Sequence, residues 1–373
     1  RLTEKLFFSI FLLFIFIKFS ISPFYNSPLV TYFYYGVLII FMFIEFLKSK
    51  RIKLNLMEVL LFFSIIWVCL IAFINADPNE FFYKKLNSLI ITILTIPITY
   101  YIFHRDLISI LMHVSSAIIL IIAILFNIFG TYDEQDPAYI LNNFYLHAAF
   151  LSGFIIFMSI VLKKHYILIA PLIVAIIIFG SRGPMLAFLL TSLLIIIPYS
   201  GRFLLEPTIK TKYIKYFIFS LPALLVPLFL FLPNLFFRTI KRWQTFFYEE
   251  GGGDSVSRRL EHFENAKDIF PNDPFFGIGF ANYGKYIDGI HSNSYPHNLF
   301  LELFIENGIL GAVPFLLCIS LILINGILNK SWPILFFVLI SMQFSYSYAE
   351  INELYFALIL TIILSKTKKQ LRN

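Results

Sequence analysis

The sequence predicts an all-α protein, a polytopic bundle of about twelve transmembrane helices with a large, partly helical outer loop. Of its 373 residues, 59% are hydrophobic and 14% are charged, and the mean hydropathy is +0.82. Soluble domains carry roughly 25% charged residues. The apolar residues gather in runs of roughly 17 to 25, and a helix of that length satisfies its own backbone amides while it crosses lipid. Soluble enzymes, disordered scaffolds and secreted disulfide-rich domains are therefore excluded.

The apolar runs give the approximate span boundaries. In order, they are 6–22, 28–47, 56–74, 87–103, 107–129, 144–162, 166–181, 184–200, 216–233, 299–327, 331–348 and 350–365. Residues 166–200 can alternatively form one hairpin with a tight Gly/Pro bend. The first run has no small-residue cleavage site, so we interpret it as a retained helix and not as a signal peptide.

Positive charges in the short loops predict the orientation. Lysine and arginine clusters fall on alternate loops, at 48–53, 163–164, 210–215 and 366–372. Such clusters mark the cytoplasmic side, which places both termini in the cytoplasm. Lys84 and Lys85 are the main exception to this pattern.

One connection, 234–298, is long and polar and is predicted to lie on the outer face. Loops of this length are uncommon unless they have a function. Asp254, Ser255 or Ser257 can cap a helix within it. The apolar positions of that helix recur every three or four residues, at Leu260, Phe263, Ala266 and Phe270. The helix is expected to be amphipathic and to lie on the membrane surface or at the outer mouth of the bundle.

Three arginines are candidates for binding an anion at the outer boundary. Arg182 ends an apolar run that faces outward, although a snorkelling interfacial anchor is an alternative. Arg258 and Arg259 lie near the start of the outer-loop helix, where cations oppose the helix dipole unless an anion is bound. Helix amides together with a guanidinium fork suit a phosphate group. The alternative for this pair is two solvated surface arginines.

His297 lies where the outer loop re-enters the membrane, and an imidazole there suits a general base. A lone histidine at a helix start can equally be structural. Asn298 shares a helix face with Glu302. Acidic residues inside a span are costly and functional by default, although Glu306 could simply pair with an arginine. Gly308, together with Gly311, is expected to allow close approach of a neighbouring helix.

No metal or cofactor is predicted, because the histidines lack an HExxH spacing and Cys69 and Cys318 lie inside apolar runs. The Gly277-Ile278-Gly279 segment lacks the lysine-serine pair of a phosphate loop. We interpret it as a tight turn after Pro274. The net charge of +7 is distributed in short clusters between spans. Since that pattern reflects membrane topology, no nucleic-acid partner is expected.

The order of these motifs resembles the bacterial O-antigen ligase/polymerase family. The motifs are Ser181-Arg182-Gly183, Ser257-Arg258, Pro274-Phe275-Phe276-Gly277-Ile278-Gly279, His297-Asn298-Leu299-Phe300-Leu301 and Glu306-Asn307-Gly308-Ile309-Leu310-Gly311. The resemblance divides the chain into N-terminal spans (1–165), a ligase/polymerase-like catalytic region with the outer loop (166–325), and C-terminal spans with a cytoplasmic tail (326–373). The loop between Gly279 and His297 has its own composition, which leaves acceptor recognition open.

The resemblance implies a metal-independent GT-C-type glycosyltransferase of the bacterial inner (cytoplasmic) membrane. It would transfer a glycan from undecaprenyl pyrophosphate to a sugar hydroxyl on the periplasmic face. Arg182 and Arg258 would neutralise the departing pyrophosphate, and His297 would take the acceptor's proton. The supporting substrate-binding residues would be Arg259, Asn298 and Glu306.

The implied partners are a lipid-linked glycan donor, a sugar or lipid A-core acceptor, and membrane lipids. A chain-length regulator or a flippase is a candidate protein partner. A polymerase and a ligase differ only in their acceptor, and we favour the polymerase. A transporter or flippase of lipid-linked oligosaccharide is the main alternative, although it would carry ionisable groups at mid-membrane. A structural membrane-assembly partner is a third alternative.

Overall fold

The computed structural model describes residues 55–104, 107–129, 142–205, 244, 254–292, 294–344, 347–348 and 352–370. All regular structure in these residues is helical, which confirms the all-α prediction. The predicted spans 6–22, 28–47 and 216–233 lie outside the described residues, and the count of about twelve spans stays a prediction.

Four of the described helical segments are long and apolar enough to cross a membrane. They are Leu56–Ile74, Ile108–Leu125, Tyr145–Leu162 and Leu299–Leu328. Each coincides with a span predicted from the sequence, with boundaries shifted by a few residues at most. The prediction of a membrane protein is therefore confirmed.

The chain forms two compact units. Unit 1 comprises residues 1–26 and 106–250, and unit 2 comprises residues 27–105 and 251–373. The predicted division of the sequence at 165/166 and 325/326 stays a prediction.

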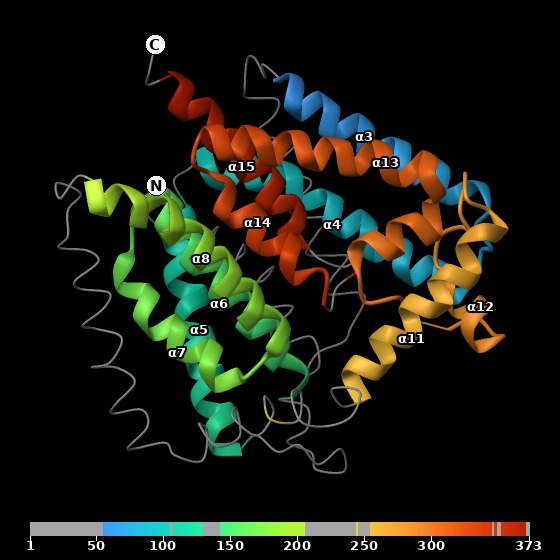
Figure 1. Cartoon of the computed structure of the whole chain (residues 1–373), viewed down its shortest axis with the longest axis horizontal. Helices are drawn as coiled ribbons and strands as arrows, with labels where there is room; N and C mark the ends of the chain where they lie inside the picture. The colour runs from blue at the N-terminus through green and yellow to red at the C-terminus, as the bar shows by residue number, and fades with distance from the viewer. Residues whose placement is uncertain are drawn as a thin grey trace. The chain divides into compact units, whose positions relative to one another are not determined.

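Unit 1 is built around α6 (Asn142–Leu162), which packs against α5 (Ile108–Phe129), α7 (Ile169–Phe179) and α8 (Arg182–Leu205) (Figure 1). A short 3₁₀ turn, η2 (Tyr166–Leu168), precedes α7. The rings of Phe150, Phe154 and Phe157 on α6 are almost completely buried in the core of this unit, among mostly aliphatic side chains.

The turn between α7 and α8 corrects one prediction. Gly180 adopts a left-handed conformation (φ 57°), and its amide donates to the carbonyls of Ile176 and Ile177. A glycine in this conformation ends a helix. The apolar run therefore stops at Phe179, and Arg182 begins α8 instead of ending the preceding span.

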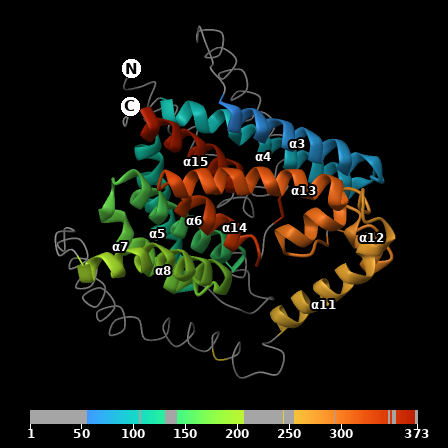
Figure 2. The same cartoon turned by 45° about the horizontal axis from the view of Figure 1, so that its top comes forward.

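Unit 2 contains long helices and residues 251–298 of the predicted outer loop. Its helices are α3 (Leu56–Ile74), α4 (Glu80–His104), α11 (Asp254–Ile269), α12 (Tyr283–Asp288), α13 (Leu299–Leu328), α14 (Trp332–Ser341) and α15 (Asn352–Gln370), with a 3₁₀ turn, η4 (Phe270–Asn272). Figures 1 and 2 both show α3 alongside α13, and α15 packs against α4, α13 and α14. The predicted span 331–348 is shorter in the structure, because α14 ends at Ser341.

Local sequence explains where α3 and α13, the two described helices of unit 2 that are long and apolar enough to cross a membrane, begin. The Asn55 side chain and Glu58 form a capping box at the start of α3, with the Asn55 amide 2.7 Å from the Glu58 carboxylate. At the start of α13, the Asn298 side chain accepts hydrogen bonds from the amides of Phe300 and Leu301. Both arrangements satisfy amides that have no partner within the helix.

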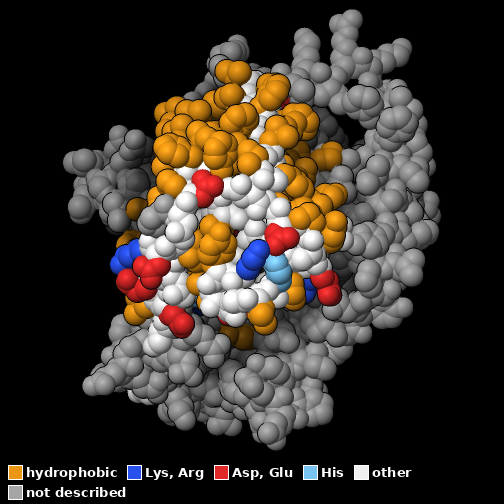
Figure 3. Space-filling model, turned by 90° about the vertical axis from the view of Figure 1, so that its right-hand side faces the viewer, with side chains coloured by type: hydrophobic (Ala, Val, Ile, Leu, Met, Phe, Trp, Pro, Cys, Tyr) orange, Lys and Arg blue, Asp and Glu red, His pale blue; other side chains and the backbone are white. Residues whose placement is uncertain are grey.

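One face of the described residues separates by polarity (Figure 3). On the face shown in Figure 3, hydrophobic side chains fill the upper part, and charged side chains gather below them. This distribution is typical of a protein with one region in lipid and another in water.

Candidate functional site

The predicted outer-loop helix is present as α11. Ala266 and Ile269 are buried in a cluster with Ile278, Tyr283 and Ile305. The predicted apolar positions nearer the start of the helix are exposed to solvent or lipid, Leu260 at 58% and Phe263 at 46%. The predicted position of α11 at the membrane surface stays a prediction.

Arg258 and Arg259 both lie in the first half of α11. The side chain of Arg258 lies outside what the structure describes. Its position precedes His262 by four residues, so the two positions share one face of the helix. The side chain of Arg259 is half-buried.

His297 lies against the rings of two residues of the predicted outer loop. Its ring centroid is 4.1 Å from that of Tyr295 and 5.6 Å from that of His262. The Nδ1 atom of His262 lies 3.0 Å from the hydroxyl of Tyr283. Burial raises the pKa of Tyr283, helped by the charges of Glu261 and Asp288, so the phenol keeps its proton and can hydrogen-bond to His262.

The backbone of His297 has a positive φ of 53°. Residues other than glycine rarely adopt this backbone conformation, and those that do are often found at functional sites. The next residue, Asn298, is the N-cap of α13, so the unusual backbone turns the loop directly into the helix.

The helix that follows His297 is broken. Gly308 has φ 58° and ψ −168°, which interrupts α13 and corrects the prediction that this glycine serves close helix packing. Gly311 does serve that purpose, since a Cβ there would lie 3.2 Å from Ile71 of α3. Non-helical backbone in a membrane segment needs other partners for its polar groups.

The Pro274–Gly279 segment supplies these partners. Four backbone hydrogen bonds join it to the break: Ile278 to Ile305 at 2.8 Å, Gly279 to Glu306 at 3.1 Å, Ile309 to Pro274 at 2.8 Å and Leu310 to Phe275 at 3.0 Å, with the amide named first. A Cβ on Gly308 would lie 2.3 Å from the Phe275 carbonyl oxygen, so only glycine fits. The predicted turn after Pro274 is present, with the Gly277 amide bonded to the Asp273 carbonyl. The same segment also satisfies the backbone groups that are freed where α13 is interrupted, a contact that the sequence did not reveal.

A buried charge cluster lies beside the break. The Lys85 Nζ donates to Glu302 Oε1 at 2.7 Å and to Glu306 Oε1 at 2.5 Å. The exposed fractions of the three side chains are 9%, 0% and 1%, respectively. Glu306 thus pairs with a lysine and not with an arginine, and this pairing accounts for Lys85 as an exception to the charge pattern of the loops.

All four carboxylate oxygens of Glu302 and Glu306 are hydrogen-bonded. Glu302 accepts from the Ser347 hydroxyl at 2.5 Å and from the Tyr348 amide at 3.1 Å. Glu306 accepts from the Tyr348 hydroxyl at 3.2 Å and from the Ala281 amide at 3.2 Å. Charges buried this deeply persist only when they are paired and hydrogen-bonded.

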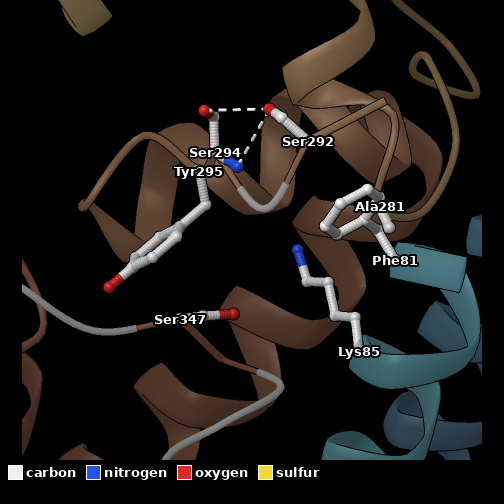
Figure 4. A pocket seen from close by; sticks show the side chains of 7 residues that line it. All are labelled: Phe81, Lys85, Ala281, Ser292, Ser294, Tyr295 and Ser347. Atoms are coloured by element: carbon white, nitrogen blue, oxygen red, sulfur yellow. Dashed lines mark hydrogen bonds between the residues drawn. The ribbon is translucent and has the colours of Figure 1, made fainter. Parts of the chain in front are cut away.

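Above this cluster lies a small polar pocket with room for about one water molecule. Figure 4 shows the Lys85 amine pointing into it, with Ser292, Ser294, Tyr295 and Ser347 around it. The Tyr295 ring forms one wall of the pocket and also contacts His297.

The predicted residues therefore fall into distinct groups. His297 contacts Tyr295 of the pocket wall, Glu306 bonds to Lys85, and Asn298 caps α13. Arg182 lies in unit 1, so its predicted meeting with Arg258 and His297 stays a prediction. Sequence reasoning missed Lys85 and His262. Glu302 and Glu306, one turn apart in a span, indicated that a buried cation such as Lys85 had to pair with them. The four-residue spacing from Arg258 indicated that His262 shares its helix face.

Residues 167–316, less than half of the chain, match the family model described as O-antigen ligase. No curated protein and no solved structure matches the chain. The predicted resemblance is confirmed over the matched region, which includes Arg182, α11 and His297. The match supports a membrane enzyme that transfers glycans.

Proposed function

Because residues 167–316 carry the O-antigen ligase family region, we propose that the donor of this enzyme is a glycan linked to undecaprenyl pyrophosphate. The acceptor is a sugar hydroxyl, and transfer takes place on the periplasmic face of the bacterial inner membrane. The observation that carries the proposal is the position of His297. It lies inside the matched region, at the junction between the outer loop and a membrane helix, and beside a polar pocket.

In the proposed reaction, the acceptor oxygen attacks the anomeric carbon in line with the departing pyrophosphate. The glycosidic bond to the pyrophosphate oxygen breaks, and that oxygen keeps the electron pair. His297 takes the proton of the acceptor hydroxyl as a general base. Its partly buried ring, held between Tyr295 and His262, supports this role because the neighbours fix its orientation.

Arg182 and Arg258 are proposed to stabilise the negative charge that develops on the pyrophosphate. A preorganised guanidinium supplies this stabilisation without a metal ion, as expected for a GT-C-type enzyme. Arg259 contributes to anion binding from the adjacent position of α11. Asn298 and Glu306 support the site from within the protein, because Asn298 caps the helix after His297 and Glu306 holds Lys85.

The acceptor decides between two versions of this activity. A second lipid-linked repeat makes the enzyme a polymerase, which we favour, and a lipid A-core sugar makes it a ligase. A deletion strain separates the two: single-repeat lipid A indicates a polymerase, and accumulated lipid-linked polymer indicates a ligase.

The test of the proposal uses the purified full chain in detergent with synthetic undecaprenyl-pyrophosphate-linked glycan. Formation of an elongated product without a membrane gradient is expected, and its absence with every acceptor tested would favour the transporter alternative. His297→Gln is expected to lower kcat by about 10²-fold or more, with donor binding retained. His113→Gln, at an exposed position of α5, is the matched control and should retain activity. Wild-type rates in the His297 variant would overturn the proposed role.

A further inference from the structure

The Lys85 amine has one hydrogen-bond donor left for a ligand. A lysine ammonium carries three N–H donors, and two of them are used by Glu302 and Glu306. The side chain is 91% buried, and its amine is directed into the pocket of Figure 4. The rings of Phe280 and Tyr348 lie 5.1 and 5.5 Å from the nitrogen and shield it from solvent.

The rim of the pocket is held in place by its own hydrogen bonds. The hydroxyl groups of Ser292 and Ser294 lie 3.0 Å apart, and both donate to one carboxylate oxygen of Asp288. These bonds lower the pKa of Asp288, which therefore stays ionised and keeps both serines oriented. A site that is fixed before binding loses less entropy when a ligand enters.

Charge and size together define what the pocket can bind. Lys85 faces two carboxylates, so the cluster has no spare positive charge to attract a phosphate. The space has room for about one water molecule, which matches a single hydroxyl group. The hydroxyl protons of Ser292 and Ser294 are donated to Asp288, so their oxygens can accept a hydrogen bond from a sugar hydroxyl, whose own oxygen can accept from Lys85.

We infer that this pocket, formed by Lys85, Ser292, Ser294, Tyr295 and Ser347, is a subsite that binds one hydroxyl group of the neutral acceptor sugar. The inference rests on the proposed function. The Tyr295 ring lines the pocket and lies 4.1 Å from the His297 ring, centroid to centroid. A sugar anchored here has its neighbouring hydroxyl groups close to the proposed base. Three of the five residues lie between Gly279 and His297, the segment whose composition left acceptor recognition open.

The test changes the size of the pocket without changing its charge. Ser294→Thr adds one methyl group to a space that fits about one water molecule. Ser292→Thr is a second variant that reaches the same space. Ser109→Thr adds the same methyl group to α5 in unit 1 and is the matched control. Thermal melting of all variants in detergent checks that they fold.

The probes are the methyl glycosides of glucose, galactose and N-acetylglucosamine, and inorganic pyrophosphate. Saturable binding of at least one glycoside to the wild-type full chain is expected. Ser294→Thr or Ser292→Thr should raise its Kd by about tenfold, the loss expected for one hydrogen bond to a charged group. Pyrophosphate should not displace the glycoside, and the control should bind like the wild type.

Three results would overturn the inference. They are no saturable glycoside binding to the wild-type protein, equal binding by both threonine variants, and displacement of the glycoside by pyrophosphate. The binding assay does not depend on turnover, so it separates this inference from the proposed function. In the transfer assay, the threonine variants should raise the KM for the acceptor about tenfold and leave the donor KM unchanged.

Discussion

Two of the lysine–carboxylate contacts in unit 2 have nearly equal lengths but lie in different surroundings. Lys85 of α4 lies 2.7 Å from Glu302, and Lys285 of α12 lies 2.9 Å from Asp77. The first pair is 9% and 0% exposed, whereas the second is 48% and 44% exposed. The inner pair lies beside the broken membrane helix, and the outer pair joins α12 to the connection between α3 and α4.

The difference shows that burial, and not distance, decides what such a contact does. Water and salt screen the outer pair, so it contributes little to folding. The inner pair has lost its hydration, so each charge depends on the other and on the surrounding hydrogen bonds. The inner cluster therefore holds α4, α13 and the Ala281 turn together.

The largest effect on stability is expected when Lys85, the cation of the inner cluster, is replaced. Lys85→Met leaves Glu302 and Glu306 buried without a counter-charge and should lower the free energy of unfolding by about 3–5 kcal/mol. Denaturant titration of the purified protein in mixed micelles measures this loss. Lys285→Met is the matched outer variant and should unfold close to the wild type.

A rescue variant separates charge from packing. Adding Glu302→Gln and Glu306→Gln to Lys85→Met removes the uncompensated charges, so most of the lost stability should return. Equal destabilisation by Lys85→Met and Lys285→Met would contradict the comparison between the two pairs.

The sequence predicted the helices of this protein better than the contacts between them. The boundaries of α3 match the predicted span 56–74, and α13 extends one residue beyond the predicted 299–327. These limits depend on local signals, namely apolar runs and capping side chains. The predicted end of the span at Ser181 was wrong by two residues because a left-handed glycine ended α7 early.

The candidate site was predicted less completely, for a physical reason. Lys85 and Glu302 are 217 positions apart, and no periodicity in the sequence connects them. The break at Gly308 is similarly non-local, since its freed backbone groups are satisfied by a segment that lies about thirty positions earlier. A candidate general base such as His297 can be proposed from its residue type and its place in the sequence. The residues that hold it depend on tertiary contacts.

Two glycines with positive φ extend the comparison to the backbone. Gly308 lies in the broken helix, where a Cβ would be 2.3 Å from a carbonyl oxygen, and Gly289 lies in the outer loop with nothing within 4 Å. Gly308→Ala should cost about 3 kcal/mol, since overpacking adds to the strain of a left-handed backbone. Gly289→Ala should cost about 1–2 kcal/mol, because only the backbone strain applies. The same denaturant titration measures both, and similar losses would contradict the role assigned to the break.

The smallest effect is expected at the outer pair, and it should depend on pH. The hydrogen bond and charge of Lys285 hold the pKa of Asp77 below its usual value, with a smaller contribution from His291. A lowered pKa in the folded state means that the pair stabilises the protein above the ordinary aspartate pKa of about 3.9. That contribution is lost as the pH falls further, through the folded-state pKa.

The melting temperature of Asp77→Asn should therefore lie slightly below that of the wild type between about pH 5 and 7. The difference should shrink below pH ~4, where the wild-type carboxylate takes up its proton. At neutral pH it should also shrink in about 1 M salt, where the screening length falls to about 3 Å. Lys285→Met should show the same salt dependence, whereas the loss in Lys85→Met should persist because its partners are shielded from ions. If the melting temperature of Asp77→Asn falls further below that of the wild type on acidification, the lowered pKa of Asp77 is contradicted. The interpretation of the outer pair as a contact screened by solvent is then also contradicted.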